Sequence, residues 1–568
     1  MFFAVLVPLL PLAAGLIIGL FGRRLGENSY KVGVPALVLA FIGSLWMLYA
    51  VSVDGPVRIG LQPFSPGSRD WLHFGLFIDR LSAIMIVLIT GVSTIIHLYS
   101  INYLQGERGY ARFYALLGLT TFVILCLVSS ANLFMLFVFW QLLSWMLYLL
   151  LSYNYTHPPA VNSALKTLIV HRVGDMAFLT GILLTYRLFG TLEFSELFAR
   201  AAESPSLIPL WPGGQPMISG VTVITLLLFV GAMAKSAQFP LHVWLPDTMD
   251  TPTPVSALMH AGIVNAGGFL LNRLAPLYGL SPTTLHVVFV VGAFTVILGA
   301  CMMLVQNDIK KTLGFSTMAQ MGYMIMECGL GAFALAIFHL IAHGVFKATL
   351  FLNAGHVIHA SRHEPKRPTI DHGGEVVPFS RVTWVTGLSV TLLLPLIILL
   401  SAHGMLQIPL LDEQGAVIFL FFAWVTAAQT MFSLSRLYAA SWKVVGLMML
   451  ALLLIIFTYL WGAETFTYFL YPEPGVTHHY FKVAALHSGL FDVLVLAVTA
   501  MIILGWGILY TNARGQRILL PGWVSTLGPR LYLLFMNRLY VDHFYTRAGQ
   551  SLLRFAQRLD HSVGGWRR

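Results

Sequence analysis

The sequence predicts an all-α, polytopic membrane protein with about 14–16 transmembrane helices. Three observations lead to this fold class. Hydrophobic residues make up 57% of the 568 residues, charged residues only 10%, and the mean hydropathy is +0.79. Soluble domains carry about 25% charged residues, so a water-soluble shape could not hide this much apolar surface. About fifteen apolar runs reach the ~20 residues that a membrane-spanning helix needs.

The predicted helices follow from these apolar runs, with boundaries expected to be accurate to a few residues. In chain order the runs are 3–22, 32–52, 77–100, 112–130, 132–153, 163–188, 218–238, 253–273, 284–305, 310–328, 331–358, 382–403, 415–438, 443–462 and 491–511. The first run lacks a clear signal-peptide cleavage site, so we expect it to stay in the protein as a transmembrane helix.

Positive charges collect in the loops that follow odd-numbered helices. These loops are RRLGENSYK, the segment with Arg108 and Arg112, NDIKK, SRHEPKR, the segment with Arg436 and Lys443, and NARGQR. Loops after even-numbered helices are mixed or acidic. Because basic loops stay in the cytoplasm, we expect the N-terminus outside a bacterial inner membrane and the C-terminus in the cytoplasm. The net charge of +10 has the same origin, so the lipid bilayer is an expected partner and nucleic acid is not.

Four regions are predicted along the chain. They are 1–110 with helices 1 to 3, a core of two repeats over 111–440, C-terminal transmembrane helices over 441–528, and a basic tail over 529–568. In the tail, apolar residues recur at helical spacing between arginines. This pattern predicts a cytoplasmic amphipathic helix on the membrane surface or on a partner, with a solvated tail as the alternative.

The core contains two sets of five helices, 4–8 and 9–13. The fourth helix of each set carries a proline, Pro240 near the end of helix 7 and Pro395 within helix 12. Proline breaks a helix by removing a hydrogen bond and clashing with the preceding turn. Paired broken helices at corresponding positions are typical of transporters built from inverted repeats, and this is the architecture we expect.

Ionisable residues inside membrane helices are candidates for ion translocation, because each is costly unless it is paired or hydrated. Lys166, Arg172 and Asp175 lie on helix 163–188, where Asp175 follows Arg172 by three residues and can pair with it. A purely structural ion pair is the alternative. Lys235 lies five residues before Pro240. Carbonyl groups freed at such a break can hold an ion, which makes Lys235 the strongest candidate.

Further candidates follow Lys235 along the chain. They are His260, Asp308, Lys310, Glu327, His339, His343, Lys347 and His403. His339, His343 and Lys347 recur every four residues and so share one helix face, as a stripe of titratable groups suited to proton transfer. For His260, an interhelical hydrogen bond is an equal alternative to proton relay.

Metal and cofactor binding are not expected in this chain. The HxxxH spacing of His339 and His343 occurs in zinc sites, but zinc takes three or four ligands, and no cysteine or carboxylate is placed to complete the set. The three cysteines Cys126, Cys301 and Cys328 fall in apolar segments and are expected to be packing residues. The sequence has no nucleotide-binding loop or nucleophile elbow, so we predict a transporter subunit and not an enzyme.

Residues from about 112 to 360 resemble the proton-pumping, antiporter-like subunits of respiratory complex I, especially subunit L, and the Mrp sodium/proton antiporters. The matching blocks are KTLIVHRVGDMAFLTGILL, AKSAQFPLHVWLPDTMDTPTPVSALMHA, NDIKKTLGFSTMAQMGYM and AIFHLIAHGVFKATLFLNAGHVI, and RLYVDHFY resembles the end of L-type chains. The resemblance implies their fold and a row of charged and histidine groups in the membrane plane. Lys235 then corresponds to the central lysine, and the connecting path has His260, Lys310, His339 and His343.

The chain departs from this family at two places. The family has a glutamate in the context FWE, which pairs with the central lysine, whereas this chain reads FWQ with Gln141. Glutamine keeps the shape and the hydrogen bonding of glutamate but cannot ionise. After the break in helix 12 the family usually has a lysine or glutamate, and here Ser401 and His403 stand instead. Glu327 is an additional acid and a candidate for a displaced carboxylate.

These departures favour a branch of the superfamily outside complex I, resembling the DabB-type membrane subunits of energy-coupled inorganic carbon transporters. The resemblance implies an H⁺ or Na⁺ conducting subunit that drives CO₂ conversion to bicarbonate in a large cytoplasmic zinc partner, the DabA type, resembling β-carbonic anhydrase. Three alternatives remain. The chain could be a pump subunit of complex I or a related hydrogenase, an Mrp-type antiporter subunit, or a scaffold that has lost conduction.

Overall fold

The computed structural model describes residues 2–61, 74–203, 206–209, 214, 217–363, 450, 454, 457, 460–473, 475–489, 491–493, 495–500 and 522–564. In this part of the chain, eight apolar helical stretches are long enough to span a membrane, and the only strands form two short hairpins. The predicted all-α membrane fold is confirmed. The predicted helices 382–403 and 415–438, and with them Pro395 and His403, lie outside the described residues.

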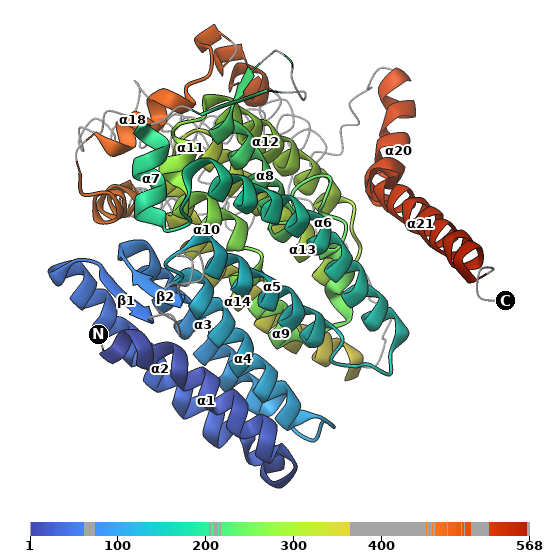
Figure 1. Ribbon diagram of the computed structural model, residues 1–568. Helices are drawn as coiled ribbons and strands as arrows, with labels where there is room; N and C mark the ends of the chain where they lie inside the picture. Colours follow the sequence, from blue (N-terminus) through green and yellow to red (C-terminus); the bar gives the residue numbers. More distant parts are fainter. Residues whose placement is uncertain are drawn as a thin grey trace.

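The first three long helices lie side by side at one end of the bundle (Figure 1). They are α1 (Phe2–Leu25), α2 (Tyr30–Asp54) and α3 (Arg80–Tyr103), with the short 3₁₀ turn η1 (Gly26–Ser29) between the first two. Between α2 and α3 the strands β1 (Val57–Leu61) and β2 (Phe74–Ile78) pair antiparallel. The sequence analysis predicted the three helices but not this hairpin.

A two-pronged ion pair joins α3 to the core. Arg273 donates from both terminal nitrogens to Asp79, at 2.6 Å and 3.0 Å. Asp79 also caps α3 by accepting from the backbone N–H of Ser82 at 2.9 Å. Burial alone would raise the pKa of Asp79, but the Arg273 guanidinium and the cap outweigh it and hold the pKa below its ordinary value. The carboxylate therefore stays charged where it joins the two helices.

Arg273→Ala should lower the free energy of unfolding by about 2–3 kcal/mol, somewhat less than a fully buried pair because Asp79 is 29% exposed. Thermal unfolding in detergent measures the change. Arg200→Ala, which removes the half-exposed pair with Glu196, is the matched control and should cost below about 1 kcal/mol. Equal losses in the two variants would contradict a special role for the Asp79 pair.

The first part of the core consists of four long helices that run alongside one another (Figure 1). They are α4 (Tyr110–Val128), α5 (Leu133–Leu151), α6 (Pro158–Phe189) and α8 (Gly220–Lys235). The sequence analysis did not predict the short amphipathic helix α7 (Phe194–Glu203) or the hairpin of β3 (Leu207–Pro209) and β4 (Met217–Ser219) between α6 and α8. Its membrane-length criterion does not detect elements this short.

The chain is interrupted after α8, as the sequence predicts, but at a different residue. The predicted helix 218–238 ends at Lys235, before Pro240 is reached. The 3₁₀ turn η3 (Leu245–Asp250) follows, and then α9 (Thr253–Leu258), the π-helical turn η4 (Met259–Ile263), α10 (Ala266–Arg273) and α11 (Ala275–Tyr278). The predicted helix 253–273 is therefore not a single α-helix. Its π turn, a feature often found at functional sites, contains His260.

Three long helices begin the second set: α12 (Pro282–Leu304), α13 (Ile309–Gly329) and α14 (Phe333–His363). The backbones of α12 and α13 meet at Gly292 and Gly322. A Cβ at Gly292 would lie 2.8 Å from the carbonyl oxygen of Gly322, and a Cβ at Gly322 would lie 2.7 Å from the backbone nitrogen of Val296. Since real Cβ atoms do not approach other atoms closer than 3.0 Å, only glycine fits at these two positions.

The C-terminal part contains α18 (Val476–Ala484), α20 (Gly522–Met536), the turn η5 (Arg538–Tyr540) and α21 (Val541–Gly564). The predicted tail helix is present as α21, which extends away from the bundle in Figure 1. Phe544 and Phe555 on this helix are exposed, as are Arg547, Arg554 and Arg558. Polar contacts at the beginning of α21 hold the tail against the core.

Candidate functional site

Lys235 is the last residue of α8 and is completely buried. Its ammonium group donates to the hydroxyl of Ser144 and, at 3.2 Å, to the backbone carbonyl of Trp140, both on α5. The nitrogen also lies 5.4 Å from the centre of the Trp140 ring, within the range of a cation–π interaction. The structure therefore places the predicted central lysine against the helix that contains Gln141.

Asp175 of α6 is the acid of this site. One carboxylate oxygen accepts from the indole N–H of Trp140 at 2.9 Å, and the other from Arg172 at 3.1 Å. Gln141 donates a further hydrogen bond to this carboxylate. Lys235 and Asp175 also attract each other electrostatically. Gln141 is thus bonded to the acid and not to the lysine, and the charge that acts on Lys235 comes from α6.

A second cluster lies where η4 faces α14. His260 stacks on Phe351, with ring centres 4.3 Å apart, and its imidazole is completely buried. The ring nitrogens of His260 and His343 make no hydrogen bond to any described residue. Lys347 acts electrostatically on both histidines, and its ammonium donates to the Ser316 hydroxyl at 2.8 Å. The structure therefore brings the predicted residues His260, His343 and Lys347 together.

Glu327 does not lie at Lys235. It accepts from His339 with a nitrogen–oxygen distance of 3.0 Å, and the other nitrogen of the His339 ring lies 2.8 Å from the side-chain oxygen of Gln320. The rings of His339 and His343 are 6.2 Å apart. The additional acid thus extends the titratable stripe of α14 and does not replace the acid missing at Gln141.

Asp308 and Lys310 have local roles at the beginning of α13. Asp308 caps the helix by accepting from the backbone N–H of Lys311 at 2.9 Å. The Lys310 ammonium donates to the carbonyl of Thr251 at 3.1 Å, in the segment between η3 and α9. Lys310 therefore links α13 to the interrupted region.

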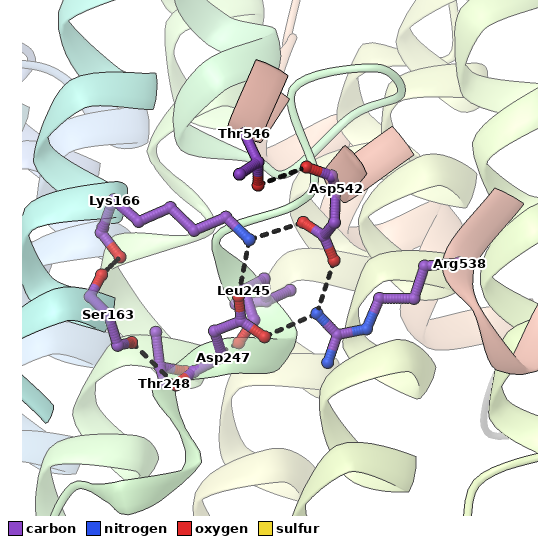
Figure 2. Close-up of polar contacts among 9 residues, drawn as sticks. Ser163, Lys166, Leu245, Asp247, Thr248, Arg538, Asp542 and Thr546 are labelled. Atoms are coloured by element: carbon purple, nitrogen blue, oxygen red, sulfur yellow. Dashed lines mark hydrogen bonds and ion pairs between the residues drawn. The ribbon is translucent and has the colours of Figure 1, made fainter. Parts of the chain in front are cut away.

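Lys166 belongs to a cluster of two cations and two acids at the base of the tail, which we call the four-charge cluster (Figure 2). Lys166 donates to Asp247 and to Asp542, each at 2.6 Å. Arg538 donates to the same two carboxylates, at 2.5 Å and 3.0 Å. The charges balance, and each acid contacts both cations. The cluster joins α6 and η3 to η5 and the beginning of α21, which lie about 300 residues later in the sequence.

The length of α6 separates the four-charge cluster from the Lys235 site. Lys166 stands 23 residues before the end of α6 at Phe189. At ~1.5 Å per residue this is about 35 Å, close to the ~30 Å thickness of the hydrocarbon core. Asp175 lies nine residues further along the helix, about 14 Å deeper. The Lys235 site is therefore buried about 14 Å along α6 from the four-charge cluster, whose side chains are 14–28% exposed.

Reversing one charge pair should test this cluster. Asp542→Lys should release the tail because it places three cations around Asp247. Lys166→Asp in the same chain should restore docking only in part, because the exchange re-forms the pair between positions 166 and 542 but places the new acid beside Asp247. Accessibility of α21 to a protease measures tail release. An Asp542→Lys tail as protected as the wild type would show that the four charges do not hold α21.

The pH dependence of tail docking follows from Asp247. Burial raises its pKa, but the charges of Arg538 and Lys166 prevail and hold the pKa below the ordinary value of 3.8. A lowered carboxyl pKa contributes stability that is complete above the ordinary value and is lost as the pH falls through the lowered one. The tail should therefore stay docked from neutral pH to about pH 4 and be released only in stronger acid.

The sequence analysis did not select two buried histidines. His171 on α6 is completely buried, and its ring packs edge-on against Trp244 with centres 4.8 Å apart. His242 is also buried and lies in the field of the four-charge cluster. The four-residue spacing of His171 and Asp175 was a usable signal, because it places both on one helix face. Among the described residues, no group of three or more His, Cys, Asp or Glu side chains could hold a metal ion.

The sequence matches two protein families. Residues 130–423 match the family described as NADH:quinone oxidoreductase/Mrp antiporter, TM, and residues 68–114 match the N-terminus of chain 5 of NADH-ubiquinone oxidoreductase, complex I. The probable inorganic carbon transporter subunit DabB1 of Halothiobacillus neapolitanus is 39% identical over 98% of both chains. NADH-quinone oxidoreductase subunit L of Neisseria meningitidis is also 39% identical, but over 67% of this chain and 57% of that subunit.

Solved structures have the same fold. A chain of the Mrp complex from Dietzia sp. superposes with a TM-score of 0.59 at 23% identity, covering 99% of this chain and 60% of that chain. A chain of an archaeal membrane-bound sulfane sulfur reductase gives a TM-score of 0.54 at 18% identity, over 89% and 96%. The predicted resemblance is confirmed: the chain belongs to the NADH:quinone oxidoreductase/Mrp antiporter family, as a multi-pass membrane subunit of the antiporter-like type.

Proposed function

We propose that this chain is the cation-conducting membrane subunit of an energy-coupled inorganic carbon uptake complex in a bacterial inner membrane. One observation carries the proposal. The similarity to DabB1 extends over 98% of both chains, whereas the match to subunit L spans only 57% of that subunit. A cation moving down its gradient past Lys235 would supply energy to a cytoplasmic partner. That partner would be a zinc-containing subunit resembling carbonic anhydrase, which converts CO₂ to bicarbonate.

The Lys235 site supports conduction. A completely buried lysine opposite a buried carboxylate, at an interruption of the helix, is a costly arrangement that membrane proteins use for ion movement. The histidine cluster of His260 and His343 provides further titratable groups in the same bundle. Gln141 removes one acid from the family pattern, but Asp175 keeps a carboxylate at the lysine. A scaffold without conduction would not need this set of buried charges.

The tail supports attachment of a partner. Arg538 of η5, the turn directly before α21, is bonded to Asp247 of η3, the turn that follows the interruption after Lys235. Farther along, α21 exposes arginines and aromatic rings. A partner bound to this helix on the cytoplasmic side would be linked mechanically to the conducting site. This arrangement requires the N-terminus outside and the C-terminus in the cytoplasm, the orientation that the basic loops predict.

Affinity purification of the full chain from its native membrane tests the proposal. We expect one large zinc protein to copurify, and uptake of labelled inorganic carbon by cells that make both proteins to stop when the ion gradient is collapsed. Copurification of quinone oxidoreductase or hydrogenase subunits would instead identify a redox-driven pump. A set of small Mrp-type membrane subunits would identify an antiporter, and uptake that persists without a gradient would exclude energy coupling.

A further inference from the structure

The buried face of α6 carries a polar stripe that connects the four-charge cluster with the Lys235 site. Ser163, Thr167, His171 and Asp175 recur every four residues and are all buried, with exposed fractions of 8%, 1%, 0% and 4%. In an otherwise apolar membrane helix, four such residues on one face form a continuous polar line. Neighbouring members are separated by a rise of ~6 Å along the helix axis, so a single water molecule can bridge each step.

Each end of the stripe is bonded to one of the two charged clusters. At the surface end, the Ser163 hydroxyl donates to the backbone carbonyl of Asp247 at 2.7 Å, a contact visible in Figure 2. The next hydroxyl, that of Thr167, donates to the carbonyl of Ser163 at 2.8 Å. At the deep end, Asp175 bonds Trp140 and acts electrostatically on Lys235. The two ends of the polar line are therefore bonded to the two clusters, and His171 stands between Thr167 and Asp175 without a hydrogen bond to either.

His171 is the titratable group in the middle of this line. Neither nitrogen of its ring makes a hydrogen bond to another described residue, although the side chain is completely buried. A buried polar group without a protein partner is rare and calls for an explanation. Trp244 packs against the ring, and Lys235 and Arg172 are the charged groups that act on it. Imidazole can take up a proton at one nitrogen while the other releases one.

The second set of helices repeats this pattern. The segment TLIVHRVGD (residues 167–175) aligns without gaps with HLIAHGVFK (residues 339–347), and four of the nine positions are identical. His171 then corresponds to His343, another buried histidine without a partner at its ring nitrogens. Asp175 corresponds to Lys347. The third helix of each set thus presents a buried histidine four residues before a charged residue.

We propose that Ser163, Thr167 and His171 form the half of the ion path that joins Lys235 to the four-charge cluster, with His171 as the proton-carrying side chain. This inference rests on the proposed function and makes the conducted ion a proton. The titratable groups between Thr167 and the end of α8 include the His171 imidazole and the Lys235 ammonium, whose nitrogens exchange protons, whereas sodium is typically coordinated by backbone carbonyls at a helix break. In each transfer His171 accepts one proton from one side and gives one to the other, so its charge is restored.

Proton flux into vesicles tests the path, with the full chain and its copurified partner reconstituted and a pH-sensitive dye inside. His171→Ala and His171→Asn should each reduce flux at least about tenfold, within the range measured for lost acid–base groups. External imidazole should restore flux to His171→Ala but not to Lys235→Ala. His157→Ala removes an exposed histidine at the beginning of the same helix and is the matched control, with wild-type flux expected.

Two results would overturn the path: wild-type flux in His171→Asn, or a loss in His171→Ala that imidazole leaves unchanged. Either would assign His171 a structural role. Flux driven by a sodium gradient alone would overturn the choice of ion. A different result would contradict the proposed function alone: proton flux in vesicles depends on His171, but cells take up inorganic carbon without an ion gradient. Copurification of the partner with each variant shows that the variants are folded.

Discussion

Lys235→Ala should reduce gradient-dependent transport at least about a hundredfold, while assembly with the partner is retained. The ammonium of Lys235, at the end of α8, interacts electrostatically with Asp175 of α6. Its hydrogen bonds to Ser144 and Trp140 of α5 hold it in place. Alanine removes the proton-binding group altogether. Proton flux in vesicles and copurification of the partner measure the two parts of this prediction.

Two further substitutions distinguish charge from proton exchange. Lys235→Met keeps most of the buried volume and removes the charge, so it should lose transport as completely as alanine does. Lys235→Arg keeps the charge but cannot release a proton, so it should also fail. Lys31→Ala, at an exposed position of α2, should transport like the wild type. Full transport in Lys235→Arg would exclude proton exchange at this residue.

Asp175→Asn should reduce transport almost as strongly, again by about a hundredfold. Gln141 cannot ionise, so the counter-charge of Lys235 comes from Asp175 on α6. Asparagine keeps an acceptor for the Trp140 indole and leaves the Lys235 and Arg172 charges uncompensated. The flux assay measures the loss, and retained copurification shows that it is not a folding defect.

Adding Gln141→Glu to Asp175→Asn should restore a substantial part of the flux. Gln141 already reaches the Asp175 carboxylate, so a glutamate there would return one negative charge to the same site. Glu327→Gln is a useful comparison, because Glu327 contacts His339 and not the Lys235 site. Failure of Gln141→Glu to improve Asp175→Asn would show that the position of the acid matters, and not only its charge.

Much of the site could be predicted because its signals are local in the sequence. Arg172 and Asp175 are three residues apart on one helix, and the structure confirms their pairing. His339, His343 and Lys347 share a face for the same reason. The end of α8 was expected near Pro240, but the helix ends at Lys235. The backbone leaves the helical conformation at Ser236, and Ala237 has a positive φ of 48°. Spacing shows which residues share a face but not where the backbone leaves the helix.

Contacts between distant segments could not be predicted in the same way. No local signal around Lys166 indicates its partners Asp247 and Asp542, the latter 376 residues away. Glu327 was a candidate for the missing acid, but the fold pairs it with His339. Periodicity indicates the face of a helix, whereas the identity of the neighbouring helix depends on packing of the whole bundle. His171 was not selected because the neighbouring Arg172 and Asp175 were considered as an ion pair and the histidine between Val170 and Arg172 was not considered separately.

The glycine contact between α12 and α13 has a mechanical consequence. Where Gly292 meets Gly322, the two backbones touch without a layer of side chains between them. A helix interface usually adjusts to small movements by rotamer changes of its side chains. Because backbone meets backbone here, the spacing between the two helices can change very little. If a neighbouring subunit displaces one of the two helices, both should move together as one rigid body. A displacement of α12 would then move α13 by the same amount, together with Glu327 near the end of α13.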